Sequence, residues 1–180
     1  MNQGDDLLPS EQLRATQIIA TSLLVGLLIF CGIALWLVRR HGGGLIPGLE
    51  VITWFAIAMF VIEVPLSFVV PRIVTRQQLK GIVEGKSPSG SRPTGGIAGQ
   101  LAAVYQAAMI IGLALLEGVG FLACIAYLLE GRPENLGIIA MVVILMMARF
   151  PRADRALAWM HEQAEELERL RQERTLTARD

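Results

Sequence analysis

Two glutamates, Glu63 and Glu117, stand near the middle of long apolar stretches, where a carboxyl group could do chemistry. A charged side chain at the centre of a bilayer costs roughly 2.5–3.5 kcal/mol on insertion scales, so acids at that depth usually face protein or water. Such carboxyls can bind a proton or a cation, or they can stay neutral and hold helices together through hydrogen bonds. Ser67 follows Glu63 by about one helical turn and could be its partner. Glu63, Glu117 and Ser67 are therefore the candidate proton or cation site, and the sequence leaves both roles open.

The surroundings of Glu117 favour a position inside a helix bundle. Ala114, Gly118 and Gly120 are small neighbours on the same helix, and small residues let another helix approach closely. The segment Met109–Leu128, MIIGLALLEGVGFLACIAYL, resembles the carboxylate-bearing helix of the rotary ATPase ring subunit c. In that family the matching glutamate carries the transported proton or sodium ion, and the resemblance implies this role for Glu117. The resemblance covers this one segment, and it assigns the whole chain to no family.

Four apolar stretches would position these acids. They cover residues 17–38, 51–70, 105–129 and 136–148 of a chain that is 53% hydrophobic. A bilayer core of about 30 Å takes about 20 helical residues, which the first three stretches supply. The fourth is short and spans only if Arg149 extends its charge to the surface; otherwise it is interfacial or re-entrant. We predict an all-α membrane bundle of four helices, at about 11–38, 50–70, 101–129 and 135–149.

Composition divides the chain into a membrane domain and a tail. Residues 1–150 are predicted to form the four-span domain, in which Pro71 ends the second helix. Residues 72–100 would form a flexible cytoplasmic loop, whose basic and apolar first half resembles a short helix lying at the lipid surface. Residues 151–180 are predicted to form a cytosolic amphipathic helix, in which charges such as Glu165 and Arg169 have the spacing of intrahelical pairs.

Basic residues predict the orientation. With four spans, thirteen of the sixteen Lys and Arg residues fall on the side that holds both termini and residues 72–100. The opposite side has Arg39, Arg40 and Arg132. Because cytoplasmic loops carry the excess of Lys and Arg, we predict a multi-pass protein of the cell membrane, the bacterial cytoplasmic membrane, with both termini inside.

The net charge, the cysteines and the lack of catalytic motifs narrow the classes of function expected for the chain. A formal net charge of zero provides no basic field for nucleic acid. Cys31 and Cys124 lie in apolar stretches and are expected to be free thiols that pack as small hydrophobes. The chain has no Ser/His/Asp, Cys/His or HExxH arrangement, so we predict a protein that is not an enzyme and holds no cofactor or metal.

The first function expected is docking or organising partners in the membrane, with the C-terminal helix as a contact and a homo-oligomer as an open possibility. The alternative is a proton- or cation-binding subunit that uses Glu117 and Glu63.

Overall fold

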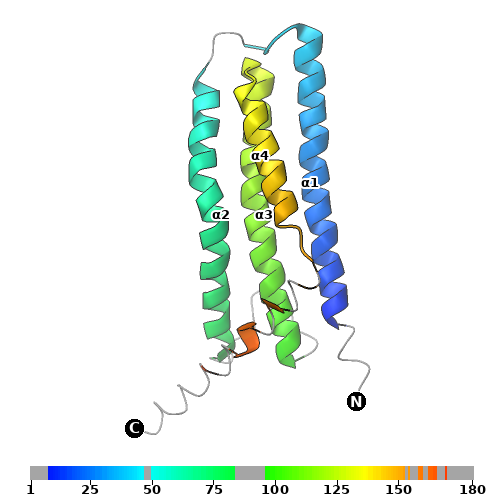
Figure 1. Cartoon of the computed structure of the whole chain (residues 1–180), viewed down its shortest axis with the longest axis vertical. Coiled ribbons are helices and arrows are strands. Elements are labelled where there is room, and N and C mark those ends of the chain that lie inside the picture. The colour runs from blue at the N-terminus through cyan, green and yellow to red at the C-terminus, as the bar shows by residue number, and fades with distance from the viewer. Residues whose placement is uncertain are drawn as a thin grey trace. The chain divides into compact units, whose positions relative to one another are not determined.

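The computed structural model describes residues 8–46, 50–83 and 96–152, together with residues 154, 158–159, 162–165 and 169. The described residues form four α-helices in chain order, which Figure 1 labels: α1 (Leu8–His41), α2 (Val51–Val83), α3 (Gly96–Glu130) and α4 (Glu134–Ala148). No strand occurs among them. The all-helical fold class predicted from the sequence is therefore confirmed for the part of the chain that the structure describes.

Three of these helices are long and apolar enough to cross a membrane. The qualifying segments are Leu13–His41, Val51–Ile82 and Gly99–Glu130. α4 has 15 residues, which at 1.5 Å per residue cover about 22 Å and fall short of the hydrocarbon layer of about 30 Å. The first and last residues of α4 each lie one residue before the predicted bounds, 135–149.

Local chemistry explains where the helices end. Gly42 follows α1 with φ +72, a conformation that glycine adopts without strain. The N–H of Gly43 donates to the Val38 carbonyl at 3.1 Å, and that of Gly42 to Arg39 at 3.4 Å. This is the backbone pattern of a glycine C-cap. Gly131 has φ +69 and ends α3 in the same way, and Pro133 precedes the first residue of α4.

The prediction that Pro71 ends the second helix is wrong. α2 continues without a break to Val83, so residues 72–83 extend this helix and do not form a separate helix at the lipid surface. Proline removes one N–H from a helix and leaves the carbonyl four residues earlier without its partner. Here that carbonyl belongs to Ser67, and Arg149 Nη1 donates to it at 2.8 Å. Residues 96–100 of the predicted loop also belong to a helix, because α3 begins at Gly96 and not at residue 101. Residues 84–95 lie outside the described residues.

Contacts within the chain define two compact units, and this division differs from the predicted boundary at residue 150. Unit 1 contains residues 1–18, 70–110 and 151–180, and unit 2 contains residues 19–69 and 111–150. Long helices contribute to both units because the division falls inside α1, α2 and α3. Each unit has its own hydrophobic core.

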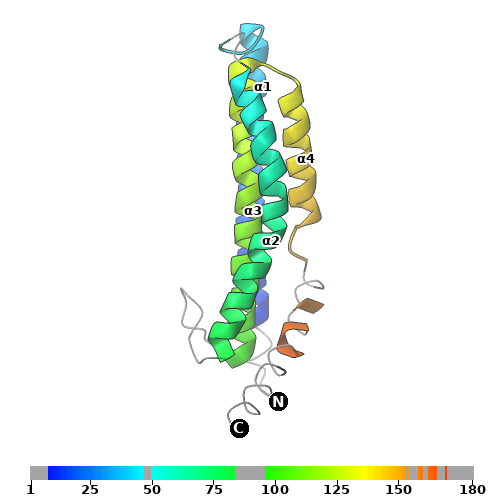
Figure 2. The same ribbon diagram turned by 90° about the vertical axis from the view of Figure 1, so that its left-hand side faces the viewer.

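The core of unit 2 lies between α1, α3 and α4. Leu27, Leu116 and Val142 are fully buried there. The rings of Phe30 and Phe121 meet edge to face, with centroids 5.4 Å apart. Figure 2 shows α4 running alongside the upper part of α3, as these contacts require.

The core of unit 1 includes part of the C-terminal tail. Leu79 and Ile82 of α2 pack with Leu101 and Val104 of α3, and Trp159 and Ala164 pack against this cluster. The rings of Tyr105 and Trp159 lie 5.3 Å apart, centroid to centroid. Gln17 Nε2 also donates to the Pro151 carbonyl at 3.1 Å. Trp159 and Ala164 of the tail are therefore packed within their own unit.

Candidate functional site

Glu63 lies on α2 and is half-buried. Its Oε2 atom is 3.8 Å from the position that a Cβ atom on Gly118 of α3 would occupy. Because glycine has no side chain, the carboxyl lies close to the α3 backbone at this point. The small residues predicted around Glu117 thus accommodate the other glutamate as well.

Glu117 lies on α3 and is also half-buried. Its Oε1 atom is 3.9 Å from the corresponding Cβ position on Gly26 of α1. Residues 117 and 118 differ by about 100° around a helix of 3.6 residues per turn. The two carboxyls therefore meet α3 on different sides: Glu117 extends from it toward α1, and Glu63 reaches it from α2.

The polar partners expected for packing carboxyls are not found in the described part of the chain. No described N–H or O–H group donates to Glu63 or Glu117, and no described basic side chain pairs with either. Polar side chains that join helices normally do so through hydrogen bonds. Neither acid makes such a bond among the described residues.

Ser67, the third candidate, uses its hydroxyl within α2. The side chain is fully buried, and Oγ donates to the Val64 carbonyl at 2.7 Å. The Ser67 backbone carbonyl accepts from Arg149 Nη1. The structure thus places Ser67 one turn from Glu63, as predicted, and joins it to Arg149 through the backbone.

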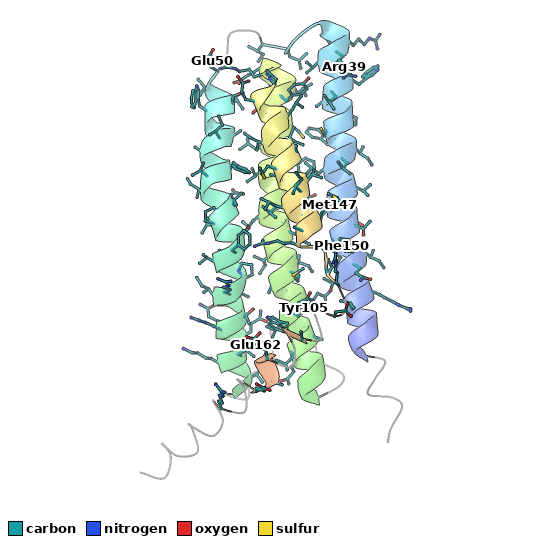
Figure 3. The ribbon with its side chains drawn as sticks, in the orientation of Figure 1. Arg39, Glu50, Tyr105, Met147, Phe150 and Glu162 are labelled. Carbon is teal, nitrogen blue, oxygen red and sulfur yellow. The ribbon has the colours of Figure 1, made fainter. Side chains whose placement is uncertain are left out.

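Arg149 is held against α2 at the end of α4. Its guanidinium carbon lies 3.6 Å from the centre of the Phe68 ring, close enough for a cation–π interaction. Figure 3 shows its chain neighbours Met147 and Phe150 at this end of α4. The sequence leaves open whether Arg149 extends its charge to the membrane surface, and the structure shows this charge in contact with a carbonyl and an aromatic ring of α2.

A second polar group, which was not predicted from the sequence, joins the N-termini of α2 and α4 to the C-terminus of α3. Glu130, the last residue of α3, accepts the N–H groups of Ile52 at 2.8 Å and Thr53 at 3.1 Å. The Thr53 hydroxyl also donates to this carboxylate. A carboxylate at a helix N-terminus pairs with unsatisfied N–H groups and with the positive end of the helix dipole. Glu130 therefore caps α2 from a distant part of the chain.

Asn135 of α4 extends this polar group. Its side chain is fully buried, and Nδ2 donates to Thr53 Oγ1 at 2.7 Å. Arg132 reaches Glu50 at 3.2 Å on the outside, and Figure 3 shows Glu50 at this end of unit 2. The acidic residue after an apolar run was visible in the sequence, but its partners at the start of α2 carried no local signal.

Metal binding has no obvious site in the described residues. They contain no group of three or more His, Cys, Asp and Glu side chains that could hold a metal ion. No protein-family model, curated protein or solved structure matches the chain. The function of the chain must therefore be inferred from the geometry of the Glu63 and Glu117 carboxyls.

Proposed function

We propose that the chain is a small, non-enzymatic, multi-pass membrane protein that binds and releases a proton or a small cation at Glu117 and Glu63. The observation that supports this proposal is the setting of the two carboxyls. Each lies against a glycine of a neighbouring helix, and no described donor or basic residue contacts it. Acids that serve only for packing would need such partners to offset the cost of their place in the membrane.

The membrane arrangement is part of this proposal. α1, α2 and α3 have the length and composition of membrane spans. We place both termini on the cytoplasmic side because thirteen of the sixteen basic residues would then lie there. α4 would cross as a short fourth span, with Arg149 bound to α2 near its end.

Carbodiimide labelling tests the proposed site. A lipophilic carbodiimide reacts with a protonated carboxyl in an apolar setting, and mass spectrometry then locates the modified residue. We expect labelling at Glu117 and Glu63, and we expect raised pH or an added monovalent cation to protect them. Glu117→Gln should remove its own label and leave the protein inserted.

Glu134→Ala provides the matched control. Glu134 is 54% exposed and reaches Arg132 at 3.7 Å. This substitution should leave labelling at Glu117 unchanged. Absence of labelling at both acids, or labelling that neither pH nor cations affect, would refute the proposal.

Docking of a partner is the second candidate function, and the described tail residues favour one form of it. Asp154, Glu162, Glu165 and Arg169 are exposed, whereas Trp159 and Ala164 pack within unit 1. A partner would therefore meet charges on the tail. Reversing charges with Glu162→Lys and Glu165→Lys should release a partner that co-purifies with the detergent-solubilised protein. Retention of every co-purifying protein by this double variant would count against docking through the tail.

A further inference from the structure

Gly120 of α3 packs against the Leu27 side chain of α1. A Cβ atom on Gly120 would lie 2.7 Å from Cδ2 of Leu27, well inside van der Waals contact. A side chain at this position would therefore require Leu27 to move. Further along both helices, Ala34 and Val38 of α1 pack with Tyr127 of α3. The residue numbers of the contacting pairs therefore increase in both helices. The two helices thus run in the same direction, with Leu27 level with Gly120.

This register places the two cysteines of the chain side by side. Cys31 follows Leu27 by four residues, and Cys124 follows Gly120 by four residues. Four residues correspond to about one helical turn, so both side chains return to the same helix–helix contact. Cys124 is fully buried in the core of unit 2, and Cys31 packs against that core. Both cysteines are free thiols.

We propose that Cys31 and Cys124 form a redox-active dithiol that a lipid-soluble quinone oxidises to a disulfide between α1 and α3. One S–S bond forms and two S–H bonds break. The two electrons and two protons pass to the quinone, which becomes the quinol. The reverse reaction with a dithiol reductant restores both thiols.

Position explains the choice of oxidant. Both cysteines lie within segments that have the composition of membrane spans, so a charged, water-soluble oxidant would have to enter the hydrocarbon layer. Cys31 is partly exposed on the surface of the described helices, which gives a lipid-soluble molecule a path to one sulfur. A disulfide requires Cα atoms within about 7 Å of each other, and the contact between Gly120 and Leu27 lies one turn away from both cysteines.

The inference is independent of the proposed proton or cation site. It needs only the thiol pair and the α1–α3 contact. A disulfide would nevertheless restrain the same helix pair that carries Gly26 and Glu117. Oxidation could therefore be detected even if neither glutamate binds an ion.

Fragment linkage after oxidation tests the proposal. A protease site inserted into the Gly-, Ser- and Pro-rich sequence between α2 and α3 separates Cys31 from Cys124 on cleavage. The full-length protein is reconstituted into vesicles, treated with a short-chain ubiquinone analogue, cleaved and run on a non-reducing gel. We expect the two fragments to migrate together, and to separate when dithiothreitol is added. Intact mass should show the loss of two hydrogen atoms.

Two kinds of variant control for chance contact. Cys31→Ser and Cys124→Ser should each leave the fragments separate. A matched variant moves the thiol on α1 by combining Cys31→Ser with Ile29→Cys. Ile29 is 59% exposed and lies about 200° around the helix from Cys31, so this thiol should not link to Cys124.

Separate fragments after quinone treatment would overturn the proposal, even if iodine oxidised Cys31 and Cys124 to a disulfide. Equal linkage in the Ile29→Cys control, or linkage between two chains, would overturn it as well.

Discussion

Arg149 donates a hydrogen bond from Nη1 to the backbone carbonyl of Ser67, at 2.8 Å. That carbonyl lies four residues before Pro71 in α2, so it is the acceptor that the proline leaves without an intrahelical donor. The guanidinium also lies over the ring of Phe68, the residue after Ser67. One side chain from the end of α4 thus compensates a break in the hydrogen bonding of α2 and lets the helix continue.

Removing this donor should destabilise the protein. Arg149→Ala leaves the Ser67 carbonyl unsatisfied, at a cost of about 1–3 kcal/mol. Unfolding in detergent, followed by far-UV circular dichroism, measures the change. Arg152→Ala is the control, because Arg152 is exposed and its loss should change stability by no more than about 0.5 kcal/mol.

Pro71→Ala should reduce the effect of Arg149→Ala. Alanine restores the N–H that pairs with the Ser67 carbonyl inside α2, so Arg149 becomes less important. A double-mutant cycle should show an interaction energy of about 0.5–3 kcal/mol between the two positions. Additive effects would show that Arg149 stabilises the protein by some other contact.

Glu130→Ala should destabilise the start of α2. The substitution removes an acceptor of the Ile52 and Thr53 N–H groups, and hydrogen bonds to a charged group contribute about 1.5–3 kcal/mol. Hydrogen exchange at these two amides should increase together with the loss of overall stability. Glu134→Ala removes an acid that reaches Arg132 at 3.7 Å and is 54% exposed. A surface pair of this kind contributes about 0–1 kcal/mol, so equal losses in the two variants would contradict the capping role.

Gly120→Ala should disturb the packing of α3 against Leu27 of α1. The new methyl group would lie 2.7 Å from Leu27, and overpacking in a close-packed core costs about 1–3 kcal/mol. Leu27→Ala in the same chain should relieve the clash. Gly32→Ala is the matched control, because no atom lies within 4 Å of its Cβ position and alanine favours a helix. Equal stability of the Gly120→Ala and Gly32→Ala variants would show that Leu27 moves aside at little cost.

Reporter fusions should distinguish the proposed membrane arrangement from others. A reporter after Gly90, between α2 and α3, and one after Asp180 should both give a cytoplasmic signal. A reporter after Gly44 should give an external signal. A cytoplasmic signal after Gly44 would reverse the orientation inferred from the basic residues.

The sequence was sufficient for features that depend on local pattern. Apolar runs predict helices wherever they occur, and they located both ends of α1, α3 and α4 to within five residues. The same runs identified Glu63 and Glu117 as unusual, because an acid in such a stretch is costly whatever surrounds it. Cys31 and Cys124 were also expected to be free thiols, and both are.

Tertiary structure decided which groups meet. Pro71 has the local signature of a helix end, but a donor 78 residues later in the chain keeps α2 intact. Glu130 and Thr53 are separated by 77 residues, and Cys31, which packs against the core that contains Cys124, lies 93 residues before it in the chain. Helix formation depends on hydrogen bonds within a few residues, whereas these contacts depend on the register in which whole helices pack. That register comes from many weak contacts between distant segments, and no short stretch of sequence contains it.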